Sequence, residues 1–176
     1  MMKKRTFILK ENRKGGAIPE FETKVDVTLT DTDITFEFFC KNSKFFSYCE
    51  GYNTELCRGD VCEAYICTDG SRVNYYEIQV AMNNSNFFSK VYNPDGNFKG
   101  TFIDVNPITS EVERLGNDYR AKFSLPLKAI NYDEKKGVLL NIFRIETEGG
   151  TQDKNLLALN PTLQNTYHRP EFFIEL

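Results

Sequence analysis

The sequence predicts an all-β protein, an antiparallel β-sandwich of the jelly-roll or immunoglobulin-like kind. Apolar and polar residues alternate over residues 33–40, 75–82 and 119–125, which is the period of half-buried strands. Turn-forming residues, such as Asn93-Pro94-Asp95-Gly96 and Gly116-Asn117-Asp118, separate these segments. The chain also has 15 Phe and 9 Tyr, and aromatic residues favour strands. Short strands joined by frequent turns are typical of a sandwich.

The length and composition predict one domain over residues 1–176. A chain of 176 residues with 40% hydrophobic content can bury one sizeable core and is too short for two full domains. Helix signals are sparse. Only Leu125-Pro126-Leu127-Lys128-Ala129-Ile130 favours one short helical turn, because proline suits a first helical position.

Charge and hydropathy exclude some partners and indicate a location. The net charge is -3 and the 22 basic residues are scattered, so the sequence shows no basic stripe for nucleic acid. The apolar stretch Phe7-Ile8-Leu9 is too short for an export signal or a membrane span. We therefore expect a cytoplasmic protein without a nucleic-acid or membrane partner. The sequence does not determine the oligomeric state.

The five cysteines lie in one third of the chain, from Cys40 to Cys67. Their odd number in a protein expected in the cytoplasm predicts free thiols that pack as small hydrophobes. A zinc site is the alternative, because Cys57, Cys62 and Cys67 recur every five residues. An odd spacing on a strand places successive side chains on opposite faces, which disfavours shared coordination.

A first strand signature, Arg58-Gly59-Asp60-Val61-Cys62-Glu63-Ala64-Tyr65-Ile66, places a carboxylate within an apolar run. Period two puts Cys62 and Ala64 on the core face and Glu63 on the other face. A carboxylate there requires a hydrogen-bonding partner, either sugar hydroxyls or an arginine such as Arg144 or Arg120. Asp60 at the strand entrance is predicted to bind backbone amides. It does not face the same side as Glu63, so this strand alone gives no catalytic carboxylate pair.

Two further signatures lie later in the chain. The second signature is Leu139-Leu140-Asn141-Ile142-Phe143-Arg144-Ile145-Glu146. Near its end, the guanidinium of Arg144 can bind a carboxylate, Glu63 or Glu146, or a pair of sugar hydroxyls. The third signature follows a polar loop and reads Tyr167-His168-Arg169-Pro170-Glu171-Phe172-Phe173. An exposed aromatic ring beside such a loop can stack on a sugar, and Tyr167 is the candidate.

These three signatures, in this order, resemble the family 9 carbohydrate-binding modules. The resemblance covers residues 25–176 and implies non-catalytic binding of a small glycan or a polysaccharide end at a shallow aromatic and polar site. It implies Tyr167 as the stacking ring, Glu63 and Arg144 as polar anchors, and Gln164 and Gln79 as weaker contacts. The family often carries structural calcium, for which Asp31-Thr32-Asp33 offers oxygen ligands.

The sequence departs from this family at several positions. A second clamp tryptophan is replaced by Cys57, for which Tyr52 could substitute, and a basic contact is replaced by Glu77 or Gln79; the chain has no Trp. The main alternative is a protein-interaction or structural sandwich that has lost the sugar site. An enzyme is disfavoured, because no carboxylate pair is evident and His168, the only histidine, lacks a catalytic partner. A haem site at Met82 and His168 has little support.

Overall fold

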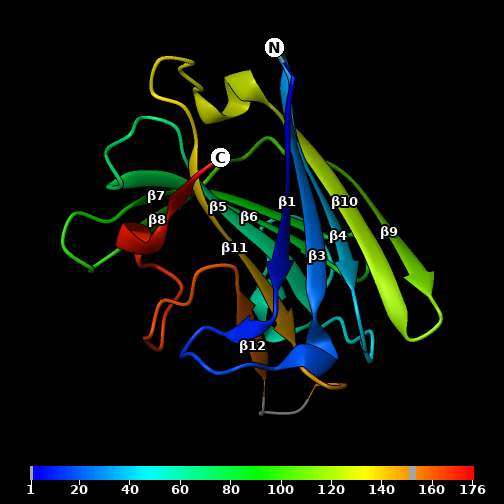
Figure 1. Cartoon of the computed structure of the whole chain (residues 1–176). Coiled ribbons are helices and arrows are strands. Elements are labelled where there is room, and N and C mark those ends of the chain that lie inside the picture. Colours follow the sequence, from blue (N-terminus) through cyan, green and yellow to red (C-terminus); the bar gives the residue numbers. More distant parts are fainter. Residues whose placement is uncertain (1, 151–153) are drawn as a thin grey trace.

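Two antiparallel sheets form a sandwich in the computed structural model, which describes residues 2–150 and 154–176. The smaller sheet has five strands (Figure 1) in the order β1 (Lys3–Leu9), β3 (Thr23–Leu29), β4 (Asp33–Cys40), β10 (Asp118–Pro126) and β9 (Thr109–Leu115). The predicted fold class is therefore confirmed.

The larger sheet has eight strands, and β11 and β5 lie at its centre. Seven follow one another in the order β2 (Glu11–Asn12), β12 (Asn155–Ala158), β11 (Leu139–Glu146), β5 (Val61–Cys67), β6 (Asn74–Ala81), β7 (Asn86–Tyr92) and β8 (Lys99–Phe102). The eighth, β13 (Ile174–Glu175), pairs with the start of β11. Neighbouring strands in both sheets are antiparallel.

Alternation correctly predicts the strands that have one covered face. In β4 and β10 every second residue is fully buried between the sheets, as the period of a pleated strand requires. Phe123 on β10 stacks between Phe36 and Phe38 of β4, with ring centroids 5.2 and 5.7 Å apart. These rings form part of the core between the two sheets.

The predicted helical turn is η3 (Leu127–Ile130), which follows Pro126. The structure contains three further 3-10 turns that the sequence did not predict: η1 (Pro19–Phe21), η2 (Leu56–Arg58) and η4 (Pro170–Phe172). Each is only three residues long, which is too short to give a periodic signal. No helix among the described residues is long and apolar enough to cross a membrane.

The outer face of the larger sheet is also covered over its central strands, among them β5, β11 and β6. Every residue of β5 is buried. The segment before β13 folds back over these strands, so that Tyr167 and Phe173 join a second apolar cluster with Tyr65 and Phe143. This cluster lies on the side of the sheet that faces away from the smaller sheet.

Asp60 anchors the loops at the entrance of β5, as predicted. Its carboxylate accepts hydrogen bonds from the backbone N–H and hydroxyl of Thr147, both at 2.7 Å, and from the N–H of Phe46 at 2.8 Å. Gly59 beside it is required by close packing, since a Cβ there would lie 2.8 Å from the backbone oxygen of Phe46. The side chain of Asp60 is thus fully buried with several donors around it.

The cysteines occupy several environments. Cys40, Cys62 and Cys67 are buried, as predicted, whereas Cys57 is exposed and Cys49 is partly exposed. Cys40 on β4 and Cys62 on β5 face each other between the sheets with their sulfurs 3.7 Å apart. In the described part of the chain, no group of three or more His, Cys, Asp or Glu side chains could hold a metal ion.

Candidate ligand-binding site

A hollow of about 330 Å³ opens on the outer face of the larger sheet. Its floor is formed by Glu63 and Tyr65 of β5 and by Glu77 and Gln79 of β6. The strand register places Glu63 opposite Gln79 and Tyr65 opposite Glu77, so these four side chains share one face. The walls come from Arg13, Lys154 and the loop at 165–168.

Glu63 is the most unusual residue of this floor. It is 2% exposed, and its Oε1 accepts a hydrogen bond from Nε2 of Gln79 at 3.0 Å. Its Oε2 has no hydrogen-bond partner among the residues that the structure describes. An unpaired buried acceptor costs about 1–3 kcal/mol, and it lies where a ligand could reach it.

Glu77 gives the hollow a second carboxylate. The same Nε2 of Gln79 donates to Oε1 of Glu77 at 2.8 Å, so both carboxylates bind one amide nitrogen. Burial and the neighbouring Glu77 carboxylate raise the pKa of Glu63 well above its usual range, and burial also raises the pKa of Glu77. The two carboxyl groups therefore hold protons more tightly than free carboxyl groups do.

Tyr167 does not offer the open ring face that the sequence analysis expects. It is 6% exposed, and its ring stacks on Phe143 at 4.1 Å between centroids and 20° between planes. The guanidinium of Arg13 lies over Tyr167, with Cζ 5.1 Å from the ring centroid. Both faces of the ring are thus occupied, and Tyr167 forms a wall of the hollow rather than an exposed stacking surface.

Arg144 does not lie at this site. It pairs with Cys62 in the strand register, whereas Glu63 pairs with Phe143, so Arg144 and Glu63 point to opposite faces of the sheet. Arg144 is fully buried between the sheets, and its Nη2 is 2.8 Å from Oε2 of Glu146. The alternative partner weighed from the sequence, Glu146, is the observed one.

Of the remaining positions considered from the sequence, two line the hollow and two do not. Gln79 lies on the floor of the hollow, but Gln164 is exposed in the adjacent loop and does not line it. Tyr52, considered as a second clamp residue, also lies elsewhere, and its hydroxyl donates to the carbonyl of Ile103 at 2.6 Å. Cys57, at the position of the family's tryptophan, does line the hollow.

His168 carries an aromatic contact that the sequence analysis missed. Its Nδ1 is 2.9 Å from the hydroxyl of Tyr75, and its Nε2 is 3.3 Å from the hydroxyl of Tyr65. Phe98 stacks on the imidazole with 3.5 Å between centroids, yet remains 47% exposed. Burial lowers the pKa of His168 to about 4, so the imidazole is neutral at physiological pH.

Glu77 was named from the sequence only as a possible replacement for a basic contact, and Phe98, Arg13 and Lys154 were not named as site residues. Glu77 alternates with Tyr76 and Ile78 and therefore lies on the polar face of its strand. Combining that face with the face of Glu63 would have indicated the carboxylate pair. Phe98 lies just after a turn and carries no periodic signal.

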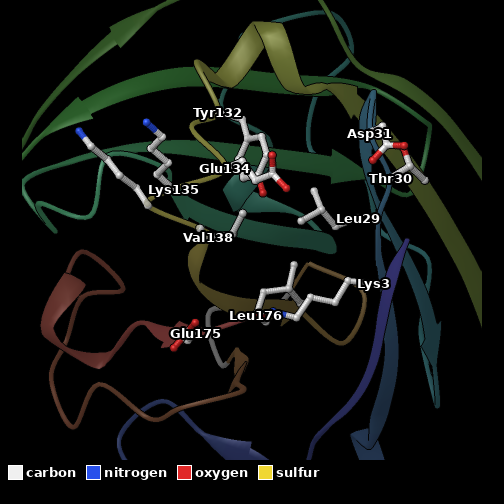
Figure 2. Close-up of a pocket in the computed structure, with 12 residues that line it drawn as sticks. Lys3, Leu29, Thr30, Asp31, Tyr132, Glu134, Lys135, Val138, Glu175 and Leu176 are labelled. Atoms are coloured by element: carbon white, nitrogen blue, oxygen red, sulfur yellow. Dashed lines mark hydrogen bonds between the residues drawn. The ribbon is translucent and has the colours of Figure 1, made fainter. Parts of the chain in front are cut away.

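A second hollow of about 450 Å³ lies between the start of β1 and the loop that precedes β11. Figure 2 shows Asp31 at its edge, with Tyr132, Glu134 and Lys135 around the opening. Asp31 belongs to the segment expected to supply calcium ligands. In the described ranges, no group of three or more acidic, Cys or His side chains occurs there that could hold a metal ion.

Comparison with curated proteins gives one informative relative. No family model matches the sequence. A protein of Arthroderma benhamiae described as extracellular is 27% identical over 171 residues, which covers 86% of this chain and 76% of the relative. The expectation of a cytoplasmic protein is contradicted by this comparison. A short apolar stretch near residue 7 was an insufficient basis for assigning a compartment.

Comparison with solved structures identifies the fold. A protein of Bacteroides uniformis, to which a carbohydrate-binding role has been ascribed, matches with a TM-score of 0.77 and 13% identity, covering 96% of this chain and 84% of that one. A family 9 carbohydrate-binding module of Caldicellulosiruptor kristjanssonii in complex with glucose matches with a TM-score of 0.66 and 13% identity, covering 96% and 82%. Its complex with cellotriose gives 0.67 and 12%, covering 95% and 80%. The chain has the fold of the family 9 carbohydrate-binding modules.

Proposed function

We propose that this protein binds a small glycan or the end of a polysaccharide, without catalysis, in the hollow over Glu63. The observation that carries the proposal is the unpaired Oε2 of Glu63, a buried acceptor on the floor of an open hollow. A sugar hydroxyl that donates to this oxygen would restore the missing hydrogen bond. Similar folds solved with glucose and cellotriose support this choice of ligand.

The size and lining of the hollow favour a single ring or a chain end. Its volume of about 330 Å³ is at the low end of small-molecule pockets, which span roughly 300–1,000 Å³. Gln79 orients Glu63, and Tyr167 provides a rigid wall beside Arg13. Phe98, stacked on His168 and 47% exposed, is the aromatic surface on which a sugar ring could extend.

The carboxylate arrangement favours binding over hydrolysis. A glycosidase places two carboxyl groups roughly 5–10 Å apart on either side of the bond that it cleaves. Here Glu63 and Glu77 approach the same amide nitrogen of Gln79, at 3.0 and 2.8 Å. Both lie on one floor, so they do not flank a glycosidic bond. The curated relative described as extracellular supports a location where polysaccharide is met.

A protein-interaction role is the second candidate, favoured by exposed aromatic residues on the last strands of the larger sheet. Tyr92 at the end of β7 is 54% exposed, and Phe102 on the edge strand β8 is 61% exposed. Exposed aromatics on an edge strand are typical of protein contacts. In that case sugar binding would be absent and these residues would be the first to test.

Calorimetric titration against glucose, cellobiose and other small sugars tests the proposal. We expect saturable heat that Glu63→Gln weakens at least about tenfold, because an amide cannot offer two acceptor oxygens. Phe98→Ala should weaken oligosaccharides more than glucose. Glu134→Gln, an exposed carboxylate outside the hollow, is the matched control and should bind normally. A flat response to every sugar would instead favour the protein-interaction role.

A further inference from the structure

The hollow contains two neighbouring carboxyl groups, which indicate its ligand more narrowly than its size does. Glu63 and Glu77 are largely buried there, and in the described ranges neither forms an ion pair with a lysine or arginine. The basic side chain beside Glu77 is His168, whose Nε2 lies 4.0 Å from Oε2 of Glu77. That imidazole is neutral, as its lowered pKa shows. Among the described residues, a charged lysine or arginine therefore does not balance this carboxyl pair, and a retained proton limits its negative charge.

The two cations that line the hollow have other contacts, although Nε of Arg13 has no hydrogen-bond partner among the described residues. The guanidinium of Arg13 lies over the ring of Tyr167, and Nζ of Lys154 donates to the backbone oxygen of Cys57 at 2.9 Å. Gln79, a neutral amide, is the group that bridges the two carboxylates. An amide donates hydrogen bonds but does not offset negative charge. Buried carboxylates without a compensating cation are unfavourable.

We propose that the preferred ligand carries a protonated amine, as in an amino sugar such as glucosamine, and that its ammonium group binds between Glu63 and Glu77. This inference rests on the proposed function and specifies its ligand. An ammonium group has three donors, which can reach the unpaired Oε2 of Glu63 and the carboxylate of Glu77. It also supplies a positive charge in place of the proton that the empty carboxyl pair retains, which a neutral hexose cannot do.

The titration behaviour of the floor agrees with this assignment. Without a ligand, burial and the adjacent carboxylate raise the pKa of Glu63, so the site resists full ionisation. Tyr65, Tyr75 and Tyr167 face the pair, and burial raises the pKa of all three phenols, so they stay neutral. Arg13 and Lys154 lie in the walls of the hollow. An added cation is the change that would stabilise the ionised pair.

Competing titrations of the full chain with three matched sugars test the inference. Glucosamine is protonated slightly below neutral pH, glucose has a hydroxyl in place of the amine, and N-acetylglucosamine carries an uncharged amide. We expect glucosamine to bind at least about tenfold more tightly than glucose, N-acetylglucosamine to show no such gain, and added salt to reduce the difference.

Variants of Glu77, with Glu134 as the control position, locate the effect. Glu77→Gln should remove the preference, so that glucosamine and glucose bind with equal affinity, and Glu134→Gln should preserve it. Thermal unfolding checks that each variant is folded, and Glu77→Asp serves as a second variant that keeps the charge and should keep the preference.

The outcomes separate the two proposals. Equal or tighter binding of glucose would overturn the amine preference and leave sugar binding intact. A preference for glucosamine that survives Glu77→Gln would also overturn it. Failure of all three sugars to bind would count against both proposals.

Discussion

Buried charged side chains on the two faces of the central strand pair β5 and β11 differ in their hydrogen-bond partners. On the inner face, Arg144 binds the backbone oxygen of Phe21 at 2.9 Å, the hydroxyl of Thr23 at 3.0 Å and the carboxylate of Glu146 at 2.8 Å. On the outer face, Glu63 has one amide partner and an oxygen without any among the described residues. Both side chains are almost completely buried.

This difference separates a structural charge from a functional one. Nη1 and Nη2 of Arg144 have protein partners, and the side chain is fully buried between the two sheets. Glu63 lines a hollow and is left partly unsatisfied, which is destabilising unless a ligand compensates. Each side chain has one buried polar atom without a partner among the described residues, Nε of Arg144 and Oε2 of Glu63. In a buried strand, such an atom therefore indicates a binding site only where it also lines an open hollow, as Glu63 does.

The largest expected effect is on the structural side of the comparison. Arg144→Met leaves Glu146 buried without its cation, and breaking a buried pair in this way costs about 3–5 kcal/mol. Chemical denaturation measures the loss. Adding Glu146→Gln to Arg144→Met should recover much of it, because no isolated charge then remains. A stability loss below about 1 kcal/mol for the single variant would mean that Arg144 is not a structural charge.

A somewhat smaller effect should come from His168 at the rim of the hollow. Its pKa is about 4 in the folded protein, against 6.5 for an ordinary histidine. As the pH falls from 6.5 to 4, His168 binds a proton in the unfolded chain but not in the folded chain. The free energy of unfolding therefore decreases by up to about 3 kcal/mol. Denaturation at several pH values measures this slope. His168→Gln should flatten it, and an unchanged slope would place the imidazole in a wetter environment.

Glu63→Gln should be more stable than the unchanged protein at neutral pH, although it binds sugar less well. Because the folded pKa of Glu63 is raised, its stability contribution is lost as the pH rises from its unfolded pKa through the folded pKa. We expect a gain in stability at neutral pH that disappears in acid. Thermal unfolding at two pH values measures it. Lower stability at neutral pH would show that Glu63 is structural, like Arg144.

The smallest effect should come from Arg120 on the surface of the smaller sheet. It contacts Glu37 at 2.7 Å, Glu111 at 2.6 Å and Glu113 at 3.1 Å. Arg120 and Glu37 are only partly exposed, but Glu111 and Glu113 are exposed, and ion pairs open to water and salt contribute little. Arg120→Gln should leave the denaturation midpoint unchanged within experimental error. A clear loss would show that charge contributes to stability even where it is solvated, which would weaken the contrast between the two faces.

Sequence alone predicts the parts of the fold that have one covered face. In β4 and β10 burial alternates with period two, so Phe36 and Phe123 could be assigned to the core directly. Asp60 was also assigned correctly, because its role depends on nearby backbone. Strand β5 gives a weaker signal, since both of its faces are covered and its apolar residues do not alternate.

The candidate site was predicted only in part, because it depends on contacts between distant segments. Glu63 and Gln79 meet through the pairing of β5 with β6. The burial of Tyr167 follows from a loop that folds over the sheet and from Arg13, which lies more than a hundred residues earlier in the chain. Local period does not report such contacts. Arg144 was misplaced because one residue of register reverses the face of a strand side chain.

The hollow draws its floor and its wall from elements of different kinds, and this has a consequence for how specificity can change. Glu63 and Gln79 are fixed by paired strands, where substitutions disturb a whole sheet. The loop at 165–168 closes the hollow from outside that sheet, and loops tolerate sequence change more readily than strands do. The same scaffold can therefore acquire a different ligand by altering the loop while the charged floor, and the stability of the sandwich, remain as they are.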